Sequence, residues 1–342
     1  SKLSIKQKLI LIMLIPLLVV ILLAAKLAVD SFSTSKNLRS LENVVVLSTK
    51  IGALVHETQK ERGMTAGFLG SSGEKFKVEL PTQRINVDEK LKDLNSFLDV
   101  FNKNDYSPEF LENLNAGLKK LENLSDTRSG VTALSLNAAL AIAYYTDLNK
   151  LLLNVIGSIT KLSNSATVSQ QLVSYMSFLL SKERAGIERA VGTNTFAKDS
   201  FGVGMKAKFY TLIAEQDAYM DSFLKVSNSK IVQFYETTLK ANSIEEVERI
   251  RKIALYSDIE TKFGIDANHW FKEITEKINL LKKVEDYISQ TLIITINDEM
   301  SDSNQNMIIF GLLSILGIAL TMILARTIAF TILIDVASVK RG

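Results

Sequence analysis

Two arginines, Arg62 and Arg184, are the residues whose type and setting point most directly to chemistry. Each ends a Lys-Glu-Arg triplet and is followed eight residues later by a glycine, and the two triplets are offset by 122 positions. A guanidinium group keeps its charge and donates hydrogen bonds from a planar fork. Two such groups that face the same space would bind a small anion, because each fork matches two oxygen atoms of a carboxylate or an oxyanion.

Both arginines are predicted to face the interior of a helical protein. On a helical wheel at 100° per residue, most residues within about 60° of each arginine are apolar. Those near Arg62 are Val44, Leu47, Ile51, Val55, Thr58, Ala66 and Leu69, and those near Arg184 are Val173, Ser177, Leu180, Ile187 and Val191. A buried guanidinium is costly unless a negative group meets it. The pattern therefore predicts an anion between the arginines or carboxylates from other helices.

The two arginines differ in the partners that their own helices offer. Arg184 has Glu188 one turn later, so an intrahelical ion pair is one explanation for its position. Arg62 has only Thr, Gln, Thr and Ala at positions 58, 59, 65 and 66. A bound anion and a carboxylate from another helix both remain open for Arg62.

Three hydroxyl groups and a third arginine are further candidates for the site. Thr58, Thr65 and Ser177 lie close enough to the two arginines on the wheel to donate hydrogen bonds to an anion, with core packing as the alternative. Arg189 belongs to the second motif but points about 140° away from Arg184. We expect Arg189 to face solvent or a partner chain, with a role in the pocket as the alternative.

The remaining residues of the two motifs have simpler interpretations. Lys60 and Lys182 lie roughly opposite their arginines on the wheel and are predicted to be solvated. Gly63, Gly67 and Gly186 could let helices approach closely around a small ligand.

The first motif resembles a known family. The run Lys-Glu-Arg-Gly-x-x-x-Gly-Phe-Leu-Gly, together with the later Lys-Glu-Arg-Ala, is similar to the nitrate- and nitrite-sensing (NIT) domain over roughly residues 36–300. The resemblance implies an all-helical bundle, found outside the membrane in bacterial receptors and also in some cytoplasmic regulators. It further implies that Arg62 and Arg184 line a pocket for nitrate or nitrite.

The residues alone support only a small anion as the ligand. The same arginines could hold the carboxylate of an organic acid or amino acid, or could pair with acids in a structural or partner-docking domain. A ligand-titrated melting curve would separate a sensor from a scaffold.

Composition excludes several other classes of function. The 342 residues include no cysteine, so disulfides, thiolate metal sites and cysteine nucleophiles are ruled out, and two histidines cannot form a His-rich metal site. The net charge is +3 with no basic patch, which gives no reason to expect nucleic-acid binding. Because no phosphate loop or nucleophile constellation stands out, we expect neither an enzyme nor a cofactor.

Two apolar runs predict membrane-spanning helices. Residues 9–25 form an uncharged run of 17 residues that contains Pro16, and residues 307–325 form a second uncharged run of 19 residues. The alternative for the first run is a cleaved signal peptide, since Ala24 and Ala25 offer small residues at its end.

Basic residues flank both runs on one predicted side, which fixes the expected topology. Lys2, Lys6 and Lys8 precede the first run, and Arg326 follows the second. We therefore expect a two-pass protein of the inner membrane that resembles the sensory half of a chemotaxis receptor and works as a homodimer. The predicted segments are a cytoplasmic flank (1–8), a first span (9–29), an extracytoplasmic sensor domain (30–306), a second span (307–325) and the start of a cytoplasmic linker (326–342).

The region between the spans is predicted to be entirely helical, because no run alternates like a strand. The expected fold is all-α, an elongated bundle of eight or nine helices. The predicted helices cover about 33–70, 83–103, 108–124, 129–162, 167–193, 205–228, 230–240, 244–257 and a last helix from about 268 into the second span.

Overall fold

The computed structural model describes residues 5–159, 162–256 and 262–339. Over these residues the chain is all-α, as predicted, and contains no strand. The helices are α1 (Ile5–Gly70), α2 (Glu79–Leu98), α3 (Pro108–Leu121), α4 (Leu124–Thr132), α5 (Ala138–Ser158), α6 (Ala166–Lys198), α7 (Met205–Val226), α8 (Ser229–Thr238), α9 (Asn242–Tyr256) and α10 (Ala267–Val339), with a short 3-10 helix η1 (Lys103–Asp105).

Local sequence signals set several helix ends where they were expected. Helix α1 ends at Gly70, and the backbone then turns through left-handed conformations at Ser72 (φ 58°) and Gly73 (φ 91°). Helix α3 begins with Pro108, and the hydroxyl of Ser107 accepts a hydrogen bond from the Phe110 amide at 3.3 Å.

Several predicted boundaries were wrong, among them those of α2, which covers Glu79–Leu98 instead of about 83–103. The single helix expected over 129–162 is two helices, because Leu134 takes a left-handed conformation (φ 55°) and the Asn137 side chain caps a new helix, α5. Helix α6 continues past Thr193 to Lys198 instead of ending in a loop. Its last turn contains Phe196, a buried residue whose ring packs against Trp270 with 5.3 Å between the ring centres.

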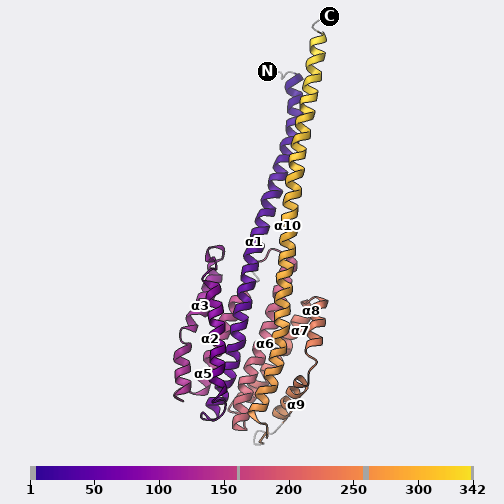
Figure 1. Cartoon of the computed structure of the whole chain (residues 1–342). Helices are drawn as coiled ribbons and strands as arrows, with labels where there is room; N and C mark the ends of the chain where they lie inside the picture. The colour runs from indigo at the N-terminus through magenta and orange to yellow at the C-terminus, as the bar shows by residue number, and fades with distance from the viewer. Residues whose placement is uncertain (1–4, 160–161, 257–261, 340–342) are drawn as a thin grey trace. The chain divides into compact units, whose positions relative to one another are not determined.

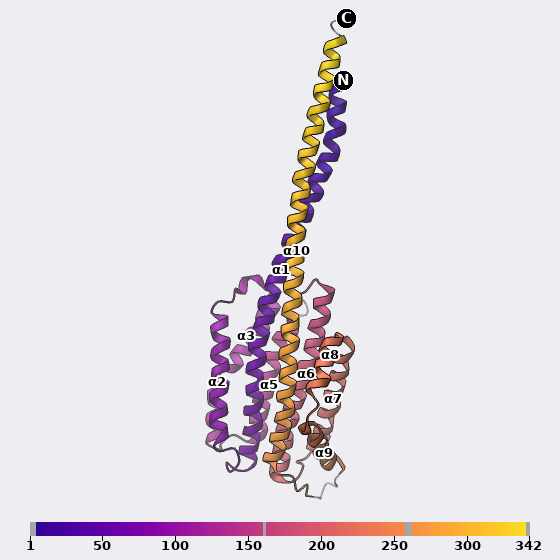
Figure 2. The same cartoon turned by 45° about the vertical axis from the view of Figure 1, so that its right-hand side comes forward.

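The chain divides into two compact units, which are described separately. The sensor unit is residues 40–295, and the terminal unit is residues 1–39 together with 296–342. In the sensor unit, one group of helices consists of α2, α3 and α5 beside α1, and a second group consists of α7, α8 and α9 beside α6 and α10 (Figures 1 and 2).

The two groups meet where α1 and α6 run parallel. A Cβ added to Gly67 would lie 3.0 Å from the Thr193 methyl carbon, and one added to Gly70 would lie 2.8 Å from the Asn194 side-chain oxygen. Gly67 therefore permits the close helix approach that the sequence suggested for it, and Gly70 does the same without having been singled out. Helix α10 runs antiparallel to α6, as its contacts with that helix follow the reverse order along the chain.

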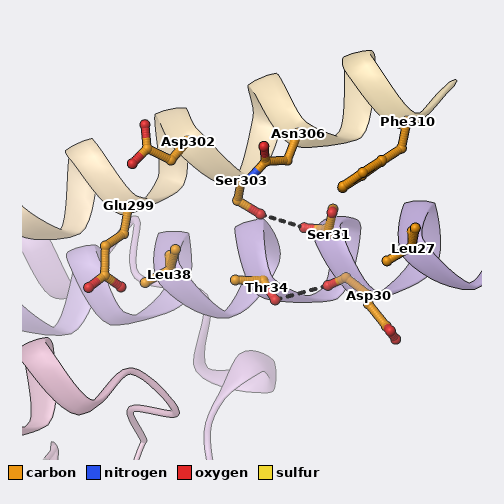
Figure 3. Close-up of a pocket in the computed structure, with 10 residues that line it drawn as sticks. All are labelled: Leu27, Asp30, Ser31, Thr34, Leu38, Glu299, Asp302, Ser303, Asn306 and Phe310. Carbon is orange, nitrogen blue, oxygen red and sulfur yellow. Dashed lines mark hydrogen bonds between the residues drawn. The ribbon is translucent and has the colours of Figure 1, made fainter. Parts of the chain in front are cut away.

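The terminal unit contains the first part of α1 and the last part of α10. Ser303 donates a hydrogen bond to the Ser31 carbonyl at 3.0 Å, so the two helices lie side by side here. An open groove of about 360 Å³ lies between them, and Asp30, Glu299 and Asp302 are among the residues that line it (Figure 3).

Both terminal helices have the length and composition of membrane spans. Among the described residues, two helical segments are long and apolar enough to cross a membrane, Ile15–Gly70 and Ala267–Ile328. In each segment the most apolar stretch is not buried inside the protein. Length and composition alone support this reading, so the two predicted spans stay predictions.

Candidate functional site, a pair of buried arginines on α1 and α6

Arg62 lies on α1 and is fully buried, as predicted. Its Nη1 atom donates to the Glu183 carboxylate at 2.7 Å and to the Thr146 hydroxyl at 3.2 Å. The Nε and Nη2 atoms have no hydrogen-bond partner among the described residues. Arg62 therefore pairs with a carboxylate from another helix, which was one of the two open alternatives. The edge of its guanidinium group formed by Nε and Nη2 is still available to a further acceptor.

Arg189 lies on α6 and is also fully buried, so the expectation that it faces solvent or a partner chain was wrong. Its Nη1 atom donates to the Thr275 hydroxyl of α10 at 2.9 Å, and its guanidinium carbon lies 5.2 Å from the centre of the Phe271 ring. Its Nε and Nη2 atoms have no hydrogen-bond partner within residues 5–159, 162–256 and 262–339. No salt bridge to Arg189 is found in the described part of the chain.

The two guanidinium groups share one place between α1 and α6, because each lies against a glycine of the opposite helix. A Cβ added to Gly186 would be 2.8 Å from Arg62 Nη2, and a Cβ added to Gly63 would be 3.2 Å from Arg189 Nε. Any larger residue at Gly186 would occupy the space next to the free edge of Arg62.

Burial and the neighbouring charge of Arg62 both act against the positive charge of Arg189. Together they lower the pKa of Arg189 to about 9, although Glu183 and Glu57 oppose the shift. Burial and the charge of Arg62 therefore outweigh the attraction of Glu183 and Glu57 for the charged form of Arg189. The site would thus gain free energy from an anion.

Arg184 does not join this pair, and the prediction that it faces inward was wrong. Its side chain is 23% exposed, pairs with Glu215 of α7 at 2.5 Å and lies over the Tyr219 ring at 5.3 Å. The predicted partner on its own helix, Glu188, is instead bound by Arg251 of α9. The second buried guanidinium next to Arg62 is therefore that of Arg189.

The three predicted hydroxyl groups have different surroundings. Thr58 is buried and donates to the Asn149 side chain at 2.6 Å, so its hydrogen is already used. Thr65 is buried one turn after Arg62, and its hydroxyl has no partner. Ser177 precedes Arg189 by twelve residues on α6, which places it roughly 18 Å away along the helix axis. Thr65 is thus the hydroxyl that best fits a ligand role, and that role stays a prediction.

The lysines of the two motifs were predicted to be solvated, which is wrong for Lys182. This residue is buried and forms an ion pair with the buried Glu285 of α10. Lys60 is 19% exposed at its side chain and pairs with Glu57 at 3.0 Å.

Most other buried charges in the sensor unit are matched by an opposite charge. Arg251 holds Glu188 with two hydrogen bonds at 2.7 and 2.6 Å, and Arg128 holds Glu61 with two at 2.8 Å. The Arg62, Arg189 and Glu183 cluster, in contrast, carries two positive charges and one negative charge. A single negative charge would balance it.

Sequence reasoning missed Glu183, Thr146 and Thr275 as neighbours of the arginines. Glu183 could have been noticed because it belongs to the Lys-Glu-Arg triplet itself. No sequence signal marks the two threonines, since they reach the site only through the packing of α5 and α10.

The site can bind but shows no arrangement for bond making. In the part of the chain that the structure describes, four guanidinium nitrogens and the Thr65 hydroxyl are buried hydrogen-bond donors without partners, and an oxyanion would satisfy them. Such orphaned donors are rare in native interiors and call for an explanation.

Comparisons with known proteins agree with an anion sensor. The family model described as "Nitrate and nitrite sensing" matches residues 53–293. The nitrate regulatory protein of Klebsiella oxytoca is 25% identical over 265 residues, which are 76% of this chain and 66% of that protein. These relatives are regulatory proteins, which confirms the prediction that the chain is not an enzyme.

A solved structure has the same fold. The structure of the NasR transcription antiterminator superposes with a TM-score of 0.72 at 23% identity, and the match covers 85% of both chains. Because the family model covers most of the chain, including both arginines, this chain belongs to the nitrate and nitrite sensing (NIT) family.

Proposed function

We propose that this chain is a transmembrane receptor that binds nitrate or nitrite between Arg62 and Arg189. The observation that carries the proposal is the pair of buried guanidinium groups, each with two nitrogens that lack a partner. Family membership supports nitrate or nitrite as the anion. Helix α6, which carries Arg189, is packed against α10, which carries Thr275, so the ligand would contact groups held by three helices.

Nitrate suits the free donors in shape and in charge. It is planar and carries one negative charge, so the free edge of each guanidinium could hold two of its oxygens or share one. The unpartnered Thr65 hydroxyl could donate a further hydrogen bond. Lysines would supply charge without this planar geometry.

The membrane placement is part of the same proposal. Two apolar segments flank the sensor unit in sequence, so we place that unit outside the cytoplasm of an inner-membrane, two-pass homodimer. The cytoplasmic output in this proposal is of the chemotaxis-receptor type. The two relatives reported above are named a nitrate regulatory protein and a transcription antiterminator, and the apolar segments support the membrane placement but not the type of output.

Signal transfer would use α1 and α10. Arg62 and the first apolar segment belong to one helix, and Thr275 and the second belong to another. A ligand changes the balance between two conformations only if it binds them unequally. Binding at Arg62 and Arg189 would therefore favour one arrangement of α1 and α10 over another.

The first prediction tests the ligand. Calorimetric titration of the purified full chain in detergent should show saturable binding of nitrate and nitrite. The melting temperature should rise with the concentration of each ligand, because a ligand that binds the folded state stabilises it. Acetate and glutamate serve as controls for carboxylate ligands. Tighter binding of either carboxylate than of nitrate would favour a sensor for an organic acid or amino acid. If no anion binds, a structural role of the two arginines is the remaining explanation.

The second prediction tests the topology. Single cysteines in place of Ser72 and Ser200, both exposed residues of the sensor unit in a chain without native cysteine, should react with a membrane-impermeant thiol reagent in cells whose outer membrane is permeable. Cysteine at Lys340 is the cytoplasmic control and should react only after lysis. Labelling of the Ser72 and Ser200 positions only after lysis would contradict the two-span arrangement.

A further inference from the structure

We infer that Glu183 sets the charge selectivity of the anion site, so that the site accepts singly charged anions and rejects dianions. This inference rests on the proposed function, because it assumes that the ligand occupies the space beside Arg62 and Arg189. It adds a specificity-determining role for a residue that does not need to touch the ligand.

Glu183 is fixed inside the site. Its side chain is 4% exposed, and one carboxylate oxygen accepts from Arg62 Nη1 at 2.7 Å. The other oxygen accepts a hydrogen bond from the Gln59 amide of α1. With both oxygens bound to α1, the carboxylate cannot leave the site without breaking contacts between α1 and α6.

The charges around this cluster are already balanced among themselves. On α1, Glu57 pairs with Lys60 at 3.0 Å. Glu61 is held by Arg84 and Arg128 from α2 and α4, and Arg128 also contacts Asp88 of α2 at 2.6 Å, so this group has two charges of each sign. On the other side, Lys182 of α6 pairs with Glu285 of α10. The formal charge left at the site is therefore that of Arg62, Arg189 and Glu183 together, which is +1.

A net charge of +1 favours a monoanion for an electrostatic reason. Nitrate, nitrite or perchlorate would bring the buried site to neutrality. Sulfate would leave one uncompensated negative charge in a water-poor interior, where charge interactions are strong, and Glu183 would repel it at short range. Without the Glu183 charge the same two arginines would offer +2 and would match a dianion.

The substitution Glu183→Gln removes the charge while keeping the size of the side chain. Its amide oxygen can accept from Arg62. Its amide nitrogen can donate to Gln59 Oε1, which lacks a partner at present and becomes available when the Gln59 amide rotates by half a turn. The variant thus has a hydrogen-bonded arrangement open to it inside the same space.

The experiment compares perchlorate with sulfate, two tetrahedral oxyanions that differ mainly in charge. Affinities of both, and of nitrate, are measured by calorimetry on the full parent chain and on Glu183→Gln. We expect the ratio of sulfate to perchlorate affinity to rise at least about tenfold in Glu183→Gln. The difference in hydration between the two anions cancels, because each anion is compared between the two proteins.

Glu183→Asp is the matched control, since it keeps the charge and should keep the parent ratio. An unchanged ratio in a folded Glu183→Gln protein would overturn the inference. Sulfate binding to the parent as tightly as perchlorate would overturn it as well, even if the variant did not fold. If either result is obtained while the parent still binds nitrate, the inference about Glu183 fails and the proposed function stands. If the parent does not bind nitrate, the inference and the proposed function both fail.

Discussion

Arg189→Met is expected to weaken nitrate binding by at least about a hundredfold while leaving the ligand-free protein as stable as the parent or more stable. The loss follows from two free guanidinium nitrogens, because charge-assisted hydrogen bonds contribute about 1.5–3 kcal/mol each. The stability result follows because Arg189 is buried, has a pKa lowered to about 9, and forms no salt bridge among the described residues. Methionine fills a similar volume without the desolvated charge.

Calorimetric titration and thermal melts of Arg189→Met check both parts of this result. Arg184→Met is the matched control on the same helix, since its guanidinium pairs with Glu215 near the surface, and its nitrate affinity should equal that of the parent. Parent-like nitrate affinity in Arg189→Met would remove Arg189 from the site. A loss of affinity in Arg184→Met alone would restore the original sequence-based assignment.

Arg251→Met is expected to lower the free energy of unfolding by about 3–5 kcal/mol, because it leaves a buried carboxylate without its counter-ion. Arg251 donates to both oxygens of Glu188, which is fully buried, and also to Gln216 at 2.9 Å. Burial acts to raise the pKa of Glu188, but the charge of Arg251 outweighs burial and holds that pKa below its ordinary value.

Chemical denaturation of the full chain measures this loss, and Arg251→Met/Glu188→Met is the control. Removing both charges together should recover much of the stability, since a buried ion pair and an apolar pair of similar volume are often close in free energy. Nitrate affinity of Arg251→Met should stay within about threefold of the parent at a temperature where the variant is folded, because Arg251 and Glu188 form a complete pair with each other. Equal stability of Arg251→Met and the parent would contradict a structural role for this pair.

Arg189 and Arg251 therefore represent two different roles of a buried arginine in this protein, one without and one with a carboxylate partner. Loss of an arginine that has its carboxylate should cost stability. Loss of an arginine that lacks one should cost ligand affinity. Arg62 combines both uses, since one edge binds Glu183 and the other edge is free.

The sequence by itself determined the fold class and the inward direction of Arg62. Sparse proline, helical apolar periodicity and local caps such as Ser107 and Gly70 predicted an all-α chain with α1 ending where it does. Arg62 was placed correctly because its inward direction shows on the wheel: apolar residues from Val44 to Leu69 mark the side on which it lies. The resemblance carried by the first motif led to the right family.

Only the tertiary structure decided which arginine of the second motif meets Arg62. Helix α6 is packed between α1, α7 and α10, and residues from Ser181 to Thr195 are buried on nearly every side, so a helical wheel gives no single inward face there. Arg184 and Arg189 point to different neighbours, and the partner elements determine the outcome: α7 presents Glu215 to the first, while α1 and α10 present Gly63 and Thr275 to the second. Glu183, Lys182 and Glu285 are buried for the same reason, because their compensating charges come from helices that are distant in the sequence.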